Sequence, residues 1–149
     1  MTEERQKYFM RQAILEGRKA LPKCRPNPPV GCVIVQYGKI IARGHTNRPG
    51  QDHAEAMALR QVDEEAADLE IFVTLEPCSY HGRTPSCARA IAHRNVKKVY
   101  VGLIDPHPRN QGAGIVILES ADIPVEIGLL REEILAELRP YLIHHHTEE

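Results

Sequence analysis

Four side chains of this sequence combine residue types that could bind a metal ion and move a proton. His53 and Glu55 stand two residues apart at the start of a predicted helix. Cys78 follows a predicted strand, and Cys87 lies in or just before the next helix. One imidazole and two thiolates form a ligand set that suits Zn²⁺. Because three protein ligands leave one tetrahedral position to water, the set predicts a catalytic rather than a structural zinc.

Glu55 has the residue type and the position of a proton shuttle. Zinc lowers the pKa of a bound water to about 7, and a neighbouring carboxylate can carry the water's proton to a substrate nitrogen. Residues i and i+2 of a helix do not share a face. Glu55 therefore reaches the open side of the metal only if His53 sits at the very start of the helix.

Each of these signals is weak when it is taken alone. Cys78 and Cys87 could be buried thiols, since free cysteine is often a core residue. The order is more specific, because His-x-Glu at a helix start, a strand, Pro-Cys and a second Cys are typical of zinc deaminases. Eight residues separate the two cysteines here, instead of the usual two. We interpret Cys24 and Cys32 as non-ligands.

The rest of the sequence predicts alternating helices and strands. Helices are expected over 4–21, 53–62, 86–93, 114–121 and 129–138, and strands over 30–35, 40–42, 69–75, 96–104 and 125–127. Buried strands separated by helices predict a single α/β domain over residues 1–149, a sandwich around a mixed but mostly parallel sheet. Functional groups of such folds gather at strand C-termini and helix N-termini.

Composition and charge exclude several classes of function. The 149 residues hold 19 Lys and Arg against 20 Asp and Glu, so the formal charge is −1 and there is no global basic field for nucleic acid. No apolar run approaches the ~20 residues of a membrane span, and the polar N-terminus predicts no secretory signal. We therefore expect a cytoplasmic location. The run His144–His146 is left out of the site argument.

Four segments of the sequence form an ordered set of motifs. They are Pro26–Gly31 (PNPPVG), His53–Glu55 (HAE), Thr74–Cys87 (TLEPCSYHGRTPSC) and Asp105–Pro108 (DPHP). This set closely resembles the motifs of the riboflavin-pathway pyrimidine deaminases, a branch of the cytidine and deoxycytidylate deaminase superfamily. The zinc motif of that family reads Thr-Leu-Glu-Pro-Cys-Ser-His and then Gly-Arg/Lys-Thr-Pro-Pro-Cys.

The resemblance implies a fold, a cofactor and a reaction. The fold would be a cytidine-deaminase-like, three-layer α/β/α sandwich with a five-stranded mixed sheet. One Zn²⁺ would be bound by His53, Cys78 and Cys87, with Glu55 as the proton shuttle. The reaction would be the hydrolytic loss of an exocyclic amine from diaminohydroxyphosphoribosylaminopyrimidine in riboflavin biosynthesis.

The resemblance also implies contacts with the substrate. Asn27 stands where the family has an Asn at the pyrimidine, and Arg83 stands where it has a basic residue towards the phosphate. An amide can pair with a ring edge, and Arg can bind phosphate bidentately. The alternatives are a turn residue for Asn27 and a solvated loop charge for Arg83. Asp105, in the fourth motif, belongs to the same expected site.

Three positions of the expected pocket depart from the family pattern. Thr46 and Tyr80 stand where the family has His, and His107 stands where it has Asn. Because these positions line the family's substrate pocket, the changes could mark a different specificity. His45 and His81 lie one residue away and could compensate.

Several other functions remain open on the sequence alone. The substrate could instead be a free base, a nucleoside, a nucleotide or a pyrimidine of secondary metabolism. A nucleic-acid base deaminase would need a basic groove, but the Lys and Arg residues are scattered. A non-catalytic, zinc-stabilised binding module would have no use for Glu55.

Partners are expected from the resemblance and from the last predicted helix. A homodimer or higher homo-oligomer agrees with the family and with the apolar side chains of that helix, which could equally close the core: Ile134, Leu135, Leu138 and Leu142. The family commonly carries a C-terminal reductase domain, and we expect none in these 149 residues. A separate reductase would then complete the riboflavin step.

Overall fold

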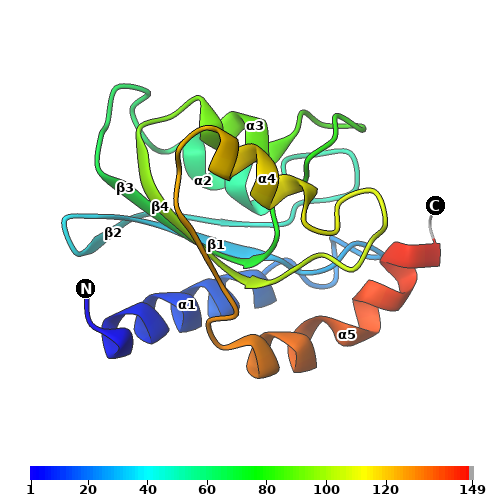
Figure 1. Ribbon diagram of the computed structural model, residues 1–149. Coiled ribbons are helices and arrows are strands. Elements are labelled where there is room, and N and C mark those ends of the chain that lie inside the picture. Colours follow the sequence, from blue (N-terminus) through cyan, green and yellow to red (C-terminus); the bar gives the residue numbers. More distant parts are fainter. Residues whose placement is uncertain (148–149) are drawn as a thin grey trace.

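The structure confirms the predicted order of helices and strands. The computed structural model describes residues 1–147, with side chains up to residue 142 (Figure 1). The helices are α1 (Glu3–Arg18), α2 (Ala54–Leu59), α3 (Cys87–Ala92), α4 (Ala113–Ser120) and α5 (Arg131–Thr147). The strands are β1 (Gly31–Gln36), β2 (Lys39–His45), β3 (Leu69–Leu75), β4 (Val96–Leu103) and β5 (Val125–Ile127). The side chains of the run 144–146 lie outside the described ones.

The last helix is longer than the sequence predicted. We expected it to end at residue 138, but α5 continues through Pro140. Proline removes one helical hydrogen bond. Burial of Leu142 beyond the proline, next to Ile134 and Leu138 in the core, favours the continued helix. Because this apolar stripe closes the protein's own core, it does not support the expected dimer.

The sheet contains fewer parallel pairs than we predicted. Its five strands lie in the order β2-β1-β3-β4-β5. Strand β1 pairs antiparallel with both β2 and β3, whereas the pairs β3–β4 and β4–β5 are parallel. The apolar run of β1 reflects a central strand covered on both faces, and a covered strand of either direction has the same sequence pattern.

Helices cover both faces of the sheet, which confirms the three-layer sandwich. In Figure 1, α1 and α5 lie below the sheet, and α2, α3 and α4 lie above it. Cys32 and Ile34 of β1 contribute to the core above the sheet, while Val33 and Val35 contribute to the core below it. Successive side chains of a strand point to opposite faces, so one strand serves both cores. Within the described chain, no helix is long and apolar enough to cross a membrane.

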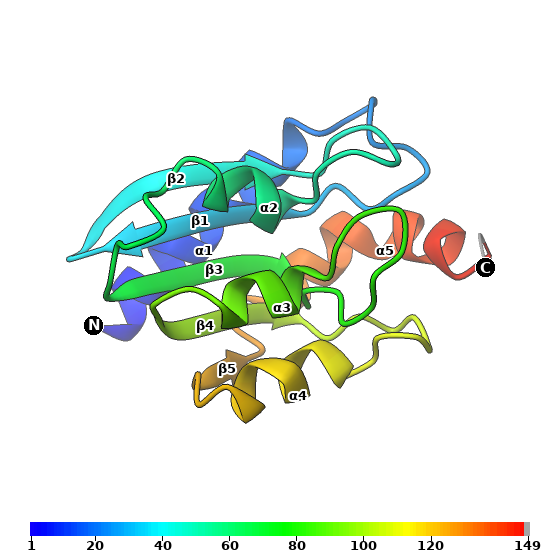
Figure 2. The same ribbon diagram turned by 90° about the horizontal axis from the view of Figure 1, so that it is seen from above.

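Four loops leave the sheet at one edge. Gly31 at the start of β1 pairs with His45 at the end of β2, and Leu75 pairs with Leu103 at the ends of β3 and β4. The loops before β1 and after β2, β3 and β4 therefore meet, as the right side of Figure 2 shows. A Cβ atom at Gly44 would lie 2.1 Å from the carbonyl oxygen of Ala54, so α2 packs directly on β2 and brings its N-terminus to this edge.

A buried carboxylate links α1 to the end of β2. Glu16 is 3% exposed, and its carboxylate lies 2.7 Å from Nδ1 of His45 and 3.0 Å from Nζ of Lys19. Burial raises the pKa of Glu16, but the hydrogen bonds and charges of its two partners outweigh burial and hold the pKa below its ordinary value of 4.5. This contact fixes the strand end from which one of the four loops begins.

We expect the substitution Glu16→Gln to lower the free energy of unfolding by about 1–3 kcal/mol at neutral pH, since an amide cannot replace the charge-assisted bonds. A carboxyl group with a lowered folded-state pKa contributes stability above its unfolded pKa and loses it as pH falls through the folded value. The deficit of the variant should therefore shrink below pH 4.5.

Urea unfolding of the parent and the variant, from about pH 7 to pH 3, measures this change. The exposed Glu64 provides a matched control, because Glu64→Gln should alter stability little at any pH. A Glu16→Gln deficit that stays constant with pH would contradict the ionic role.

Candidate active site

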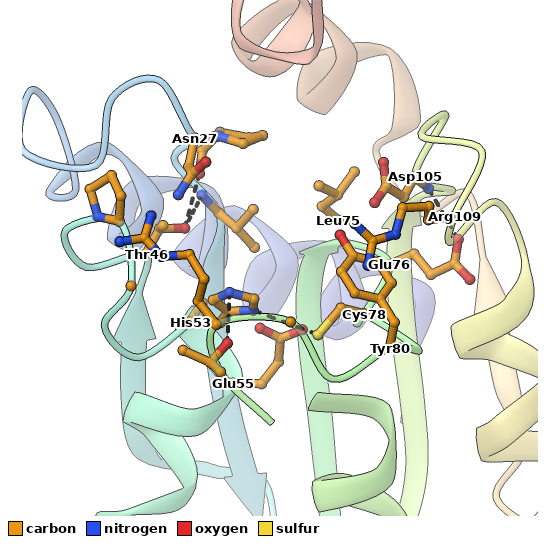
Figure 3. A pocket seen from close by; sticks show the side chains of 18 of the residues that line it. Asn27, Thr46, His53, Glu55, Leu75, Glu76, Cys78, Tyr80, Asp105 and Arg109 are labelled. Atoms are coloured by element: carbon orange, nitrogen blue, oxygen red, sulfur yellow. Dashed lines mark hydrogen bonds between the residues drawn. The ribbon is translucent and has the colours of Figure 1, made fainter. Parts of the chain in front are cut away.

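A pocket of about 370 Å³ opens where the four loops meet. In Figure 3, Asn27 and Thr46 lie on one side of it, and Tyr80 and Asp105 lie on the other. Glu55 lies at the base, between the two sides. The pocket thus forms at strand ends and a helix N-terminus, as the fold class predicted.

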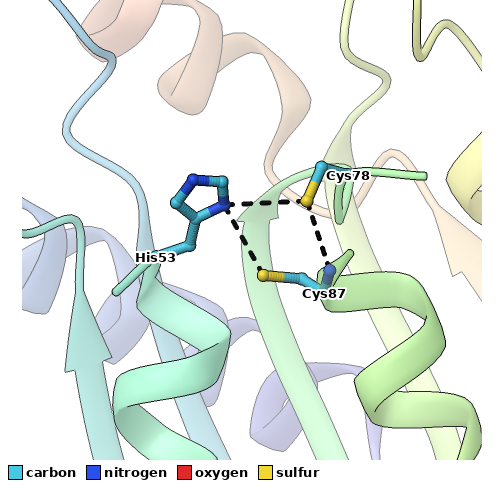
Figure 4. A group of neighbouring side chains, drawn as sticks. All are labelled: His53, Cys78 and Cys87. Carbon is cyan, nitrogen blue, oxygen red and sulfur yellow. Dashed lines mark hydrogen bonds between the residues drawn. The ribbon is translucent and has the colours of Figure 1, made fainter. Parts of the chain in front are cut away.

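The three predicted metal ligands converge beside the base of the pocket (Figure 4). Nδ1 of His53 lies 3.7 Å from Sγ of Cys78 and 3.6 Å from Sγ of Cys87. All three ligand atoms lie within 4.8 Å of one another. Tetrahedral zinc bonds of about 2.05 Å to nitrogen and about 2.3 Å to sulfur separate these two atoms by about 3.6 Å. The donor set and its spacing therefore fit one Zn²⁺.

Local structure orients each of the three ligands. His53 is the N-cap of α2 and has extended backbone angles (φ −73°, ψ 169°). Cys87 is the first residue of α3, and its backbone N–H donates to Sγ of Cys78 at 3.2 Å. Ser86 caps α3, and its Oγ donates to the carbonyl oxygen of Cys78 at 2.8 Å. Hydrogen bonds of the chain itself thus hold the two cysteines together.

The cysteine pair carries its negative charge unequally. A hydrogen bond from the Cys87 thiol lowers the pKa of Cys78 to about 4, against the opposing effect of burial. The same bond, together with burial, raises the pKa of Cys87 well above its usual range. The pair therefore accepts one negative charge readily and a second one only beside a cation, which suits a divalent metal.

Glu55 meets the geometric condition that the sequence imposed. Because His53 caps the helix, Glu55 falls in the first turn of α2 and reaches the pocket. It is 4% exposed, and burial is the main cause that raises its pKa to about 7. A carboxyl group at this place can take up or release a proton near neutral pH.

Thr84 contacts the metal-ligand imidazole from its other side. Its Oγ1 lies 3.2 Å from Nε2 of His53. If Nδ1 binds a metal, Nε2 carries the ring proton, and this N–H donates a hydrogen bond to Oγ1 of Thr84. Such a bond fixes the tautomer and the orientation of a ligand histidine.

A family of known proteins shares this site. The model of the family described as the cytidine and deoxycytidylate deaminase zinc-binding region matches residues 3–103, which include the three ligands and Glu55. The chain belongs to this deaminase family.

Known members of the family extend well beyond this chain. RibD of Chlamydia pneumoniae, a riboflavin biosynthesis protein, is 41% identical over 139 residues, which are 93% of this chain and 37% of that protein. RibD of Acinetobacter baumannii has a TM-score of 0.92 and 42% identity over 98% of this chain and 41% of that chain.

A third relative from Thermotoga maritima is described as a diaminohydroxyphosphoribosylaminopyrimidine deaminase/5-amino-6-(5-phosphoribosylamino)uracil reductase. It has a TM-score of 0.88 and 37% identity over 98% of this chain and 42% of that chain. The chain spans about two fifths of the length of these relatives.

Most of the predicted substrate residues line the pocket: Asn27, Thr46, Tyr80, Arg83 and Asp105. His107 does not. It is 1% exposed, its backbone N–H donates to Oδ1 of Asp105 at 3.0 Å, and its Nδ1 accepts the backbone N–H of Arg109 at 3.1 Å. The imidazole ring of His107 is packed into this turn. It therefore supports the loop behind the pocket wall and does not line the pocket.

Thr46 reaches the pocket, but its hydroxyl group is used by the backbone. Oγ1 donates to the carbonyl oxygen of Pro28 at 2.9 Å and accepts the N–H of Val30 at 3.0 Å. These bonds attach the loop that carries Asn27 to the end of β2. Thr46 therefore positions a pocket wall.

Sequence reasoning missed three residues of the site. Glu76 is buried, and its carboxylate accepts the N–H groups of Asp105, Gly112 and Ile115 at 3.1, 2.9 and 3.2 Å. Asn110 accepts the N–H of Ser79 at 3.1 Å and donates to the carbonyl oxygen of Pro77 at 3.2 Å. Arg109 lines the pocket. The acidic Glu76 within the predicted zinc motif was a signal of a structural role. The sequence could not show its partners, because they lie 29 to 39 positions away.

We expect the substitution Thr84→Val to weaken zinc binding by about 10–100-fold, since it removes the partner that orients His53. Thr84→Ser keeps the hydroxyl group and should retain the parental affinity. Competition for zinc with a coloured chelator measures both constants. Equal zinc affinity in the parent and the valine variant would show that Thr84 does not orient the ligand.

We expect Thr46→Val to lower the free energy of unfolding by about 1–3 kcal/mol, because it removes both hydroxyl bonds and leaves the Val30 N–H and the Pro28 carbonyl oxygen with their mutual bond at 3.0 Å. Thr46→Ser should cost clearly less, since its hydroxyl group can make both bonds. Urea unfolding compares the variants. A serine variant as unstable as the valine variant would assign the effect to packing of the methyl group.

Proposed function

We propose that this chain removes an amino group from a phosphoribosylated aminopyrimidine by hydrolysis, and that the substrate is diaminohydroxyphosphoribosylaminopyrimidine. The observation that carries the proposal is the pocket base, where three ligand atoms with zinc spacing lie beside the buried Glu55. The Thermotoga maritima relative is named for this deaminase activity.

The proposed reaction consumes one water and releases one ammonia. A zinc ion held by His53, Cys78 and Cys87 would lower the pKa of a bound water molecule. Glu55 accepts a proton from the water and passes it to the exocyclic amine of the ring. The water oxygen bonds to the ring carbon, the C–N bond breaks, and ammonia leaves with the transferred proton. The pyrimidine retains the oxygen.

The donor set supports a catalytic rather than a purely structural role for the metal. The ligand cluster found among the described residues contains three side chains, whereas structural zinc sites use four. A buried carboxylic acid is costly to desolvate, and Glu55 has no evident use in a zinc-stabilised binding module. Both points favour an enzyme over a non-catalytic module.

The proposed substrate suits the residues around the pocket. The amide of Asn27 can both donate to and accept from a ring edge, and Arg83 can bind a phosphate. Deoxycytidylate is the competing substrate, because the family description includes it. Since both molecules carry a phosphate, the ring and the sugar must decide between them. A nucleic-acid substrate is disfavoured by the formal charge of −1.

Partners and location remain predictions. The expected partner is a reductase that acts on the deaminated product, because the Thermotoga maritima relative is described as both a deaminase and a reductase. A homodimer would need a surface other than the buried stripe of α5. A cytoplasmic location and a single domain over residues 1–149 complete the proposal.

We expect zinc-loaded protein to release ammonia from diaminohydroxyphosphoribosylaminopyrimidine. Glu55→Gln should lower kcat by about 10²–10⁴-fold with an unchanged zinc content, because an amide cannot transfer the proton. Removal of zinc with a chelator should abolish the activity, and added zinc should restore it. A coupled ammonia assay and metal analysis provide the measurements.

Glu64→Gln on the surface is the control and should keep the parental rate. Release of ammonia from deoxycytidylate alone would overturn the substrate while keeping the reaction class. No release from either compound by zinc-loaded protein would overturn the proposed function.

A further inference from the structure

Two of the departures from the family motif contact the same residue. The guanidinium carbon of Arg109 lies 4.2 Å from the centre of the Tyr80 ring, and Nδ1 of His107 accepts the backbone N–H of Arg109 at 3.1 Å. The resemblance places His and Asn at positions 80 and 107. The two residues that differ from the family motif, Tyr80 and His107, therefore both contact Arg109, and Arg109 lines the pocket.

The Tyr80 ring supports the Arg109 side chain. A guanidinium group over an aromatic face is held by cation–π attraction and presents its N–H donors at its edge. Tyr80 lies on the same side of the pocket as Arg109 in Figure 3. The aromatic contact thus limits the rotamers of a long side chain at the pocket rim, which reduces the entropy lost when that side chain binds a ligand.

The backbone beneath Arg109 is firmly attached to the metal-site loop. Asn110 bonds to Ser79 and Pro77, and its backbone N–H donates to the carbonyl oxygen of His107 at 2.9 Å. Because the 105–110 loop is tied to the segment just after β3, Arg109 has a fixed position relative to the metal ligands.

A second arginine lies at the opposite wall. A Cβ atom at Gly50 would lie 2.9 Å from Nη2 of Arg83, so this guanidinium rests on the loop after β2. Both arginines are exposed, whereas the acidic groups Glu55, Glu76 and Asp105 are buried. The exposed charged side chains of the pocket lining are therefore cationic.

We propose that Arg109 contacts the phosphate monoester of the substrate, opposite Arg83, and that Tyr80 and His107 are positioning residues for it. The proposal rests on the proposed function for its substrate. At this wall the guanidinium group of Arg109 contacts the phosphate, whereas the side chains of Tyr80 and His107 do not contact it. Arginine binds phosphate through paired N–H donors, so a monoester dianion at the rim matches this chemistry.

Calorimetric titration of the zinc-loaded protein with ribose 5-phosphate tests the contact without requiring turnover. We expect Arg109→Gln to weaken this binding at least about tenfold. The control Arg89→Gln, on the exposed face of α3 and outside the pocket, should bind as the parent does. Ribose without phosphate should bind no better to the parent than to Arg109→Gln. Equal affinity of the parent and Arg109→Gln for ribose 5-phosphate, or no binding by the parent, would overturn the proposal.

A double-mutant cycle tests the positioning role of Tyr80. Tyr80→Leu should weaken ribose 5-phosphate binding, and Tyr80→Phe should restore most of it because the ring is retained. In the Arg109→Gln background, Tyr80→Leu should have little further effect. If Tyr80→Leu weakens binding equally in both backgrounds, Tyr80 acts independently of Arg109 and the positioning role is wrong.

Failure of the Arg109 contact can be distinguished from failure of the proposed reaction by kinetic measurements. Where ammonia is released, Arg109→Gln should raise KM for the phosphorylated substrate and leave kcat within about twofold of the parent. If no ammonia is released while ribose 5-phosphate binding still depends on Arg109, the anion site stands and the proposed reaction fails. Release with a KM that Arg109→Gln does not change would overturn the anion site alone.

Discussion

The meeting of one imidazole nitrogen and two sulfur atoms around a single point is the constraint on which the structure depends. These ligands come from residues 25 and 34 positions apart, so no local element can bring them together. The close packing of α2 on Gly44 and the start of α3 at Cys87 place two helix N-termini at one sheet edge. Hydrogen bonds from the chain then set the separation of the ligands.

Buried carboxylates perform three different tasks around this centre. Glu16 pairs with His45 and fixes the end of β2. Glu76 binds three backbone N–H groups and attaches the start of α4 to the zinc motif, where an anion is also favoured by the helix dipole. Glu55 lies at the pocket base, and burial raises its pKa. The surroundings of each carboxylate, and not its residue type, determine what it does.

The sequence was sufficient for features that depend on local residue types. It predicted the order of the elements, and it predicted the metal ligands because His-x-Glu at a helix start, followed by a strand, Pro-Cys and a second Cys, is typical of zinc deaminases. It could not give the direction of β1 against β3, because a covered strand has the same apolar pattern in either direction. It also missed the backbone bonds of Thr46 and the contact of Arg109 with Tyr80, which join segments distant in sequence.

The antiparallel placement of β1 has a consequence for how such a pocket can diversify. The wall that carries Asn27 enters the sheet from α1, on the face opposite to α2 and α3. The first turns of α2 and α3, which carry Glu55 and Cys87, therefore belong to the upper layer, while the pocket wall that carries Asn27 belongs to the lower layer. Mutations that lengthen or reshape that entering loop can alter the accepted ligand and leave the metal centre intact. Substrate range and reaction type can evolve separately in this architecture.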